Sequence, residues 1–239
     1  MLTSVGAGAV SFTCTLPASD RRETSTFYLR MTPTRAVVTW LAHRLFPLVM
    51  DIRAAGLEHL PPTGPVVLAS NHLTNFDVFP MQMVLPRPLF FMGKSELFHN
   101  PALGWLIRQL GAFPVRRGAR DDWAIDYSAK VLAAGQLLGI FPEEMRSKGT
   151  GMRAAKTGAA RLAIHANAPI VPLALTGTHR LFRAWYRSSP VTITLGAPLL
   201  PKHFDTPAAL TDRLMFTIAQ MLPPEYRGVY ADQSQVHGP

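Results

Sequence analysis

The feature that most constrains the fold is the alternation of short apolar runs with longer amphipathic ones after residue 64. Residues 65–70, Pro-Val-Val-Leu-Ala-Ser, are short, apolar and partly β-branched, which is typical of a strand buried in a sheet. Similar runs predict strands at 89–92, 112–116, 138–141, 170–176 and 191–195. The periodic segments between and after them predict helices at 76–84, 102–110, 122–134, 152–166 and 207–221. This order predicts an α/β fold with a central mixed sheet covered by helices.

The chain is long enough for one sizeable domain, and neither an internal repeat nor an interdomain linker is visible. Residues 1–30 are rich in Gly, Ala, Ser and Thr and have no clear hydrophobic period, so we predict a disordered leader there. The remaining residues, 31–239, form a single predicted domain. Cys14 is the only cysteine, which excludes an internal disulfide and favours a reducing compartment.

An apolar segment at the start of this domain predicts a helix over residues 34–50. It is interrupted by Arg44 and falls short of the roughly 20 apolar residues that cross a bilayer. An interfacial helix fits better, with Trp40 and Phe46 at headgroup depth and Arg35 and Arg44 on lipid phosphates. The alternative is a helix that packs on the core. The first interpretation places the protein on the cytoplasmic side of a membrane, as a peripheral or monotopic protein.

The charge is unevenly distributed. The formal net charge is +9, and residues 145–204 contain no Asp or Glu while carrying many Lys and Arg. Such a stretch predicts a positive face that suits an anionic membrane surface or a phosphate-bearing substrate. A plain solvated basic surface is the alternative. Because the chain has no recognised nucleic-acid-binding motif, we expect no nucleic-acid partner.

His72 and Asp77 are the residues best placed for acid–base chemistry. His72 follows a predicted strand directly, and functional residues collect at strand ends in open α/β sheets. Thr74 followed by Asp77 resembles a capping box, a turn that would bring the carboxylate back toward the imidazole. A carboxylate on one ring nitrogen fixes the tautomer, and the other nitrogen can then take a proton from an alcohol. The alternative is structural: a histidine that ends a strand and an aspartate that caps a helix.

No nucleophile or metal site accompanies this pair in the sequence. Residues 93–97, Gly-Lys-Ser-Glu-Leu, lack the second glycine of a Gly-x-Ser-x-Gly elbow. There is neither a His-Glu-x-x-His motif nor a pair of cysteines for zinc, and Ala155 stands where a phosphate-binding loop has glycine. We therefore expect no metal and no cofactor, and a base that activates a substrate hydroxyl directly.

Two further clusters carry arginine at predicted strand ends. One is residues 111–117, Gly-Ala-Phe-Pro-Val-Arg-Arg, and the other is residues 141–147, Phe-Pro-Glu-Glu-Met-Arg-Ser. The planar guanidinium group suits phosphate oxygens. Each cluster taken alone is better explained by a surface salt bridge.

Taken together and in order, these segments resemble the glycerolipid acyltransferase family, which includes the 1-acylglycerol-3-phosphate acyltransferases. The resemblance covers roughly residues 64–201. The family's His-x4-Asp motif is matched by His72 and Asp77, with Asn71 before them. Its glycine–phenylalanine–arginine motif is matched by Gly111, Phe113 and Arg116. Its Phe-Pro-Glu-Gly-x-Arg-Ser motif is matched by Phe141, Pro142, Glu143, Arg146 and Ser147, and its Val-Pro strand by Val171 and Pro172.

One departure concerns the third motif. Glu144 stands where the family has glycine, and Met145 where it commonly has threonine. Glycine at such a place permits unusual backbone angles or a close approach of substrate. The acceptor head group therefore stays open, while the acyl transfer itself is less affected.

The resemblance implies acyl transfer from acyl-CoA or acyl carrier protein to the hydroxyl of a lysophospholipid such as 1-acylglycerol-3-phosphate. It implies His72 as general base and Asp77 as its orienting carboxylate. Glu143 is expected to orient Arg146 or to bond a glycerol hydroxyl. The substrate-binding residues that it implies are Asn71, Gly111, Phe113, Arg116, Arg117, Glu143, Arg146, Ser147 and Pro172. Two alternatives remain: a phospholipid transacylase or hydrolase using the same pair, and a non-catalytic basic membrane-binding module.

Overall fold

The computed structural model describes residues 32–116, 121–181, 188–204 and 206–232. It also gives the backbone of two short antiparallel strands, β1 (Ser11–Thr13) and β2 (Thr26–Tyr28). Apart from these two strands, the leader predicted over residues 1–30 lies outside the described residues, and so does Arg117.

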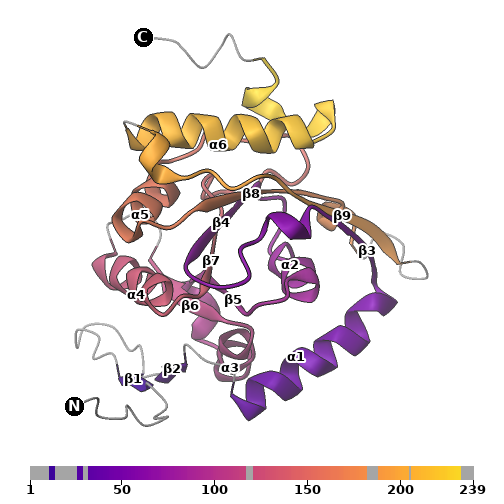
Figure 1. Ribbon diagram of the computed structural model, residues 1–239. Coiled ribbons are helices and arrows are strands. Elements are labelled where there is room, and N and C mark those ends of the chain that lie inside the picture. The colour runs from indigo at the N-terminus through magenta and orange to yellow at the C-terminus, as the bar shows by residue number, and fades with distance from the viewer. Residues whose placement is uncertain are drawn as a thin grey trace, which may run out of the picture.

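The core of the molecule is a seven-stranded sheet in the order β3-β9-β8-β4-β7-β5-β6 (Figure 1). Neighbouring strands are parallel except β8 and β9, which are antiparallel, so the sheet is mixed as predicted. The strands are β3 (Met50–Ala55), β4 (Val66–Ser70), β5 (Leu89–Lys94), β6 (Ala112–Val115), β7 (Leu137–Ile140), β8 (Ile170–Thr176) and β9 (Ser189–Leu195).

The sequence predicted six of these strands and missed β3. That strand lies at the edge of the sheet, pairs only with β9, and has a single buried residue, Met50. An edge strand exposed along most of its length lacks the apolar signal on which a sequence-based prediction rests.

Helices cover both faces of the sheet (Figure 1). They are α1 (Pro33–Leu45), α2 (Val78–Val84), α3 (Pro101–Gln109), α4 (Asp122–Ala133), α5 (Gly158–Ala166) and α6 (Pro207–Met221). One apolar core joins the sheet to α4, α5 and α6, and a second joins its other face to α2. The cap predicted for the last helix is confirmed, because Thr206 Oγ1 accepts the N–H of Ala209 at 3.1 Å.

The helix predicted over residues 152–166 begins only at Gly158. The backbone N–H groups before it are bonded elsewhere: that of Met152 to the Tyr226 carbonyl, that of Ala155 to the Tyr230 hydroxyl, and that of Lys156 to the Pro142 carbonyl. These tertiary bonds replace helical ones and keep residues 151–157 as a loop.

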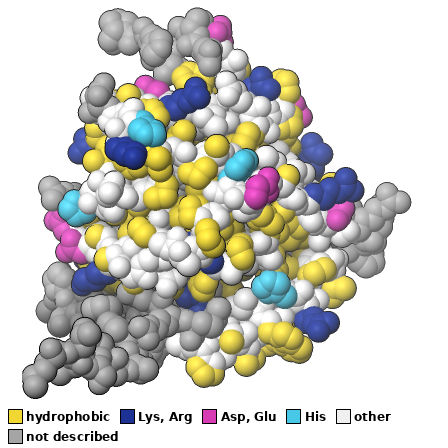
Figure 2. Space-filling view, in the orientation of Figure 1, with side chains coloured by type: hydrophobic (Ala, Val, Ile, Leu, Met, Phe, Trp, Pro, Cys, Tyr) yellow, Lys and Arg dark blue, Asp and Glu magenta, His cyan; other side chains and the backbone are white. Residues whose placement is uncertain are grey.

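The N-terminal helix is present but shorter than predicted, since α1 ends at Leu45 and a 3-10 turn, Phe46–Leu48, leads into β3. Much of its surface is apolar and exposed, and Figure 2 shows these side chains gathered at the lower right. The large exposed apolar residues are Val37, Trp40, Leu41 and Leu45 on α1, and Leu48 in the turn after it. Arg35, predicted to lie on lipid phosphates, is instead buried against the domain. Among the described residues, no helix has the length and apolarity needed to cross a membrane.

Candidate active site

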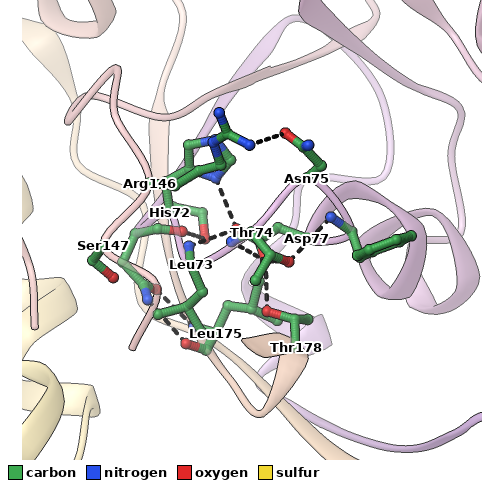
Figure 3. Close-up of polar contacts among 12 residues, drawn as sticks. His72, Leu73, Thr74, Asn75, Asp77, Arg146, Ser147, Leu175 and Thr178 are labelled. Carbon is green, nitrogen blue, oxygen red and sulfur yellow. Dashed lines mark hydrogen bonds and ion pairs between the residues drawn. The ribbon is translucent and has the colours of Figure 1, made fainter. Parts of the chain in front are cut away.

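His72 and Asp77 form a buried pair just beyond the carboxyl end of β4. His72 Nδ1 lies 2.8 Å from Asp77 Oδ2, and the side chains are 7% and 0% exposed (Figure 3). The His72 ring also stacks on the Phe141 ring, with centroids 4.1 Å apart. Nε2 makes no hydrogen bond to any residue in the described ranges. The pair therefore has one ring nitrogen fixed and the other available to a substrate.

The Asp77 carboxylate is held by several donors besides His72. The backbone N–H groups of Leu73 and Thr74 donate to Oδ2 at 2.7 and 3.0 Å, and the Thr74 hydroxyl donates to Oδ1 at 3.1 Å. The side chain thus reaches back over the turn as the acid of a capping box does. The Thr74 hydroxyl accepts from Phe76 N–H rather than from Asp77 N–H, so only one half of the predicted box forms.

A residue from a distant segment completes this arrangement. The buried Thr178 hydroxyl, from the turn after β8, donates to Asp77 Oδ1 at 2.5 Å (Figure 3). The sequence analysis missed Thr178, since 101 residues separate it from Asp77. Its place directly after the Val-Pro strand was the one signal in the sequence that could have drawn attention to it.

Glu143 supports His72 through the backbone. Its Oε1 accepts the His72 N–H at 2.9 Å, and its Oε2 accepts the Arg153 N–H at 2.7 Å. Burial raises the pKa of this carboxyl to about 7, the two hydrogen bonds oppose that rise, and the nearby Asp77 charge adds to it. The Glu143 carboxylate therefore bonds two backbone groups, whereas Arg146 bonds Asn75. The predicted bond from Glu143 to a glycerol hydroxyl of the acceptor stays a prediction.

Asn71 and Ser147 fix the position of the segment that carries His72. The Asn71 amide donates to the Leu175 carbonyl at 2.9 Å and accepts the Leu175 N–H at 2.8 Å, which fastens the end of β4 to β8. The Ser147 backbone N–H donates to the His72 carbonyl at 2.8 Å. Both residues were predicted to bind substrate, and in the structure their described bonds are to the protein backbone.

The arginines differ in their distance from the pair. Arg146 donates to the Asn75 side-chain oxygen at 2.9 Å, so its exposed guanidinium lies beside the turn between His72 and Asp77 (Figure 3). Arg116 lies past the carboxyl end of β6, three strands from β4, or about 14 Å at the usual strand spacing. Of the two motif arginines that the structure describes, Arg146 is therefore the one that lies at the His72 site.

Three further residues predicted to bind substrate have structural roles in the fold. Phe113 is fully buried and packs on Tyr127 with ring centroids 4.6 Å apart. Pro172 is buried within β8 and pairs in register with Ala69. Gly111 precedes β6 with φ +88°, and a Cβ there would lie 2.2 Å from the Leu89 carbonyl oxygen. These positions need a core side chain, a sheet residue and a glycine for structural reasons.

Glu144 adopts the backbone conformation that glycine would have there. Its φ is +55°, in the left-handed region that costs an L-residue roughly 1–2 kcal/mol. The exposed carboxylate pairs with Lys156 at 2.6 Å. Glu144 therefore occupies a backbone conformation that favours glycine. Among the described residues, no group of three or more His, Cys, Asp or Glu side chains is arranged to hold a metal ion.

The fold and the site together define an α/β protein in which a buried histidine, paired with a carboxylate, lies at the carboxyl end of a central strand. The chain belongs to the acyltransferase family, whose sequence profile matches residues 51–176.

Sequence similarity to known proteins supports the assignment to the acyltransferase family. The chain is 33% identical over 181 residues to a 1-acyl-sn-glycerol-3-phosphate acyltransferase of Chlamydomonas reinhardtii, an alignment covering 72% of this chain and 53% of that protein. It is 28% identical over 177 residues to the 1-acyl-sn-glycerol-3-phosphate acyltransferase of Bacillus subtilis, covering 71% of this chain and 87% of that protein. The chain thus spans about half the length of the algal relative.

A solved structure has a similar fold. The crystal structure of the 1-acyl-sn-glycerophosphate acyltransferase PlsC from Thermotoga maritima superposes with a TM-score of 0.67 at 22% identity. The alignment covers 78% of this chain and 77% of that one. At this identity the likeness establishes the α/β fold predicted from the sequence.

Proposed function

We propose that this protein transfers an acyl chain from a thioester, acyl-CoA or acyl carrier protein, to the hydroxyl of a lysophospholipid such as 1-acylglycerol-3-phosphate. The observation that carries the proposal is the 2.8 Å contact between His72 Nδ1 and Asp77 Oδ2, which leaves Nε2 without a hydrogen bond to the described residues. The names of the relatives, 1-acyl-sn-glycerol-3-phosphate acyltransferases, support this acceptor.

In the proposed reaction, His72 Nε2 takes the proton of the acceptor hydroxyl as the oxygen attacks the thioester carbonyl carbon. The carbon–oxygen bond of the new ester forms, the carbon–sulfur bond breaks, and the leaving thiolate takes the proton back from the imidazolium. Asp77 holds the tautomer and stabilises the charged ring. The reaction balances without a metal or a cofactor.

The acceptor phosphate is proposed to bind Arg146, whose guanidinium is exposed beside the His72–Asp77 turn. Arg116, and Arg117 from outside the described residues, are proposed as further contacts for a longer head group. The pair of Glu144 and Lys156 places one charge of each sign on the adjoining loop, so it adds no net positive charge to the acceptor site.

The acceptor and product are amphiphiles, so we propose that the protein works at an anionic membrane surface, on its cytoplasmic side. The exposed apolar residues of α1 supply the contact, and Arg44 lies on the same helix for lipid phosphates. The aromatic rings of Phe46, Phe79 and Phe76 form a chain of contacts from the end of α1 toward the turn that carries Asn75. A lipid acceptor could follow this apolar path to His72.

The test is acyl transfer by the purified protein with several lysophospholipids and either acyl-CoA or acyl carrier protein, with the products identified by mass spectrometry. His72→Ala should remove the transfer, whereas His99→Ala, at an exposed histidine, should not. Full activity in His72→Ala would overturn the assignment of the base. Transfer from a phospholipid without any thioester would identify a transacylase instead, and lipid binding without acyl transfer would leave only a binding module.

A further inference from the structure

A cavity of about 490 Å³ lies between α1, α3 and α4, at the starts of β5 and β6. These strands run parallel to β7 and β4, so the cavity lies at the end of the sheet opposite to the carboxyl end that carries His72. Its lining combines apolar and cationic groups, including Arg35, Phe90, Trp105, Arg108 and Tyr127. None of these residues is used in the proposed reaction.

Arg35 brings an uncompensated charge into the cavity wall. The residue is 4% exposed, and its guanidinium lies over the Phe90 ring, 4.5 Å from the centroid. Its one side-chain hydrogen bond is a long one, 3.3 Å, to the Leu89 carbonyl oxygen. No ion pair joins it to a carboxylate in the described parts of the chain. Burial lowers its pKa to about 10, which reflects the cost of keeping this charge from water.

Arg108, from α3, supplies a second guanidinium to the same cavity. Its Nε is buried and has no hydrogen-bond partner among the described residues, although its guanidinium lies 5.9 Å from the Phe98 ring centroid. A buried donor without an acceptor is costly, so such donors usually have a partner. Because Arg35 and Arg108 both line the cavity, an anion bound there would lie beside positive charge from two helices.

Gly111 makes room for this arrangement. A Cβ at this position would lie 2.8 Å from the Arg35 terminal nitrogen, in addition to its clash with the Leu89 carbonyl. The positive φ of +88° also favours glycine. Gly111, the glycine of the second motif, therefore leaves the space that the Arg35 side chain occupies in the cavity wall.

We propose that this cavity binds the phosphate group of an acidic lipid, separately from the acceptor site at His72. Arg35 and Arg108 contact the oxyanion, since guanidinium groups bind phosphate with charge-assisted hydrogen bonds. Phe90 and Trp105 contact the apolar part of the ligand. Trp105 is 49% exposed and shares α3 with the exposed Leu103 and Leu106, so the lipid chains can leave the cavity along an apolar surface.

The test uses a short-chain phosphatidic acid below its micelle concentration, with short-chain phosphatidylcholine and inorganic phosphate as comparisons, and calorimetry as the readout. Arg35→Gln and Arg108→Gln should each weaken phosphatidic acid binding roughly tenfold or more, the usual effect of losing a charge-assisted bond. Arg213→Gln removes the same charge from an exposed position on α6 and should bind as the wild type does. Thermal unfolding of each variant shows whether it is folded. If Arg35→Gln does not fold, binding by Arg108→Gln tests the proposal.

Wild-type affinity in both cavity variants, or an equal loss in Arg213→Gln, would overturn the proposal. Equal affinity for inorganic phosphate would support the oxyanion site but identify free phosphate as its ligand. Acyl transfer with detergent-solubilised substrates separates the two sites, because folded Arg35→Gln and Arg108→Gln should keep the wild-type rate. Loss of acyl transfer in those folded variants would show that the cavity binds the acceptor. That result would contradict the proposal that the cavity is separate from the acceptor site. The binding result stands whether or not the proposed reaction is found.

Discussion

The hydroxyl of Thr178 donates a hydrogen bond to Asp77 Oδ1 at 2.5 Å, while Asp77 Oδ2 lies 2.8 Å from His72 Nδ1. The Thr178 hydroxyl thus adds a donor from the turn after β8 to an oxygen that also accepts from the Thr74 hydroxyl, while the other oxygen contacts the imidazole. A carboxylate that is bonded on both oxygens cannot rotate away from the imidazole without losing a bond. Thr178 is therefore a positioning residue for the His72–Asp77 pair.

Replacing this hydroxyl tests that role. Thr178→Val keeps the shape of the side chain and removes the donor, and we expect kcat to fall roughly 10- to 100-fold, the effect of one bond to a charged group. Thr178→Ser retains the donor and should restore most of the rate. The measurement is kcat and KM for acyl transfer, with KM nearly unchanged in both variants. An equal loss in the serine variant would point to packing rather than to the hydrogen bond.

Removing the charge of Asp77 should have a larger effect. Asp77→Asn keeps the size of the side chain but no longer stabilises the imidazolium, so we expect kcat to fall about 10²- to 10⁴-fold. Asp51→Asn, at an exposed aspartate on β3, is the matched control and should be near wild type. Steady-state kinetics at saturating donor checks this prediction. Near wild-type kcat in Asp77→Asn would show that the pair has a structural role only.

Glu143 should make stability depend on pH in an unusual direction. Because its pKa is raised from 4.5 to about 7 in the folded protein, the folded state binds more protons than the unfolded chain between these values. The free energy of unfolding should therefore fall as pH rises from 4.5 to 7 and level off above that. The loss is on the order of 3 kcal/mol, at about 1.4 kcal/mol per pKa unit.

Glu143→Gln separates this contribution from other titrations. The glutamine cannot ionise, so the decline of stability between pH 4.5 and 7 should flatten in urea unfolding experiments. It can accept the N–H of His72 or of Arg153 through its one oxygen, but not both, so stability at low pH should drop by roughly 1–3 kcal/mol. Glu58→Gln, at an exposed residue, is the control. An unchanged decline in Glu143→Gln would assign the pH dependence to another group.

Glu144 offers a test of backbone strain. Glu144→Gly relieves a left-handed residue with φ +55°, so we expect the free energy of unfolding to rise by about 1 kcal/mol. Glu144→Ala also removes the exposed pair with Lys156 but keeps the strained backbone, so it should not be stabilising. The comparison of these two variants by urea unfolding isolates the backbone effect. Equal stability of the glycine and alanine variants would contradict it.

Much of the fold follows from the sequence alone. Strands such as β4 and β8 are fully or almost fully buried, and their continuous apolar runs could be recognised without any knowledge of their neighbours. The amphipathic helices and the Thr206 cap were predicted for the same local reason. The His72–Asp77 pair belongs to this group as well, because one turn of chain brings two residues only five positions apart into contact.

The tertiary structure decided how that pair is held and what the other motif residues do. Glu143 reaches the His72 backbone across 71 residues, and Thr178 reaches Asp77 across 101. Arg35 is buried where the sequence placed it on a membrane, because α1 packs against the domain at its start and stays exposed farther along. Contacts between distant segments depend on how strands are ordered and helices packed, and a local sequence pattern carries neither. The sequence by itself therefore determined the buried strands, most of each helix and the local pair. The packing of distant segments decided the exposed edge strand β3, the start of α5 and the residues that support the pair.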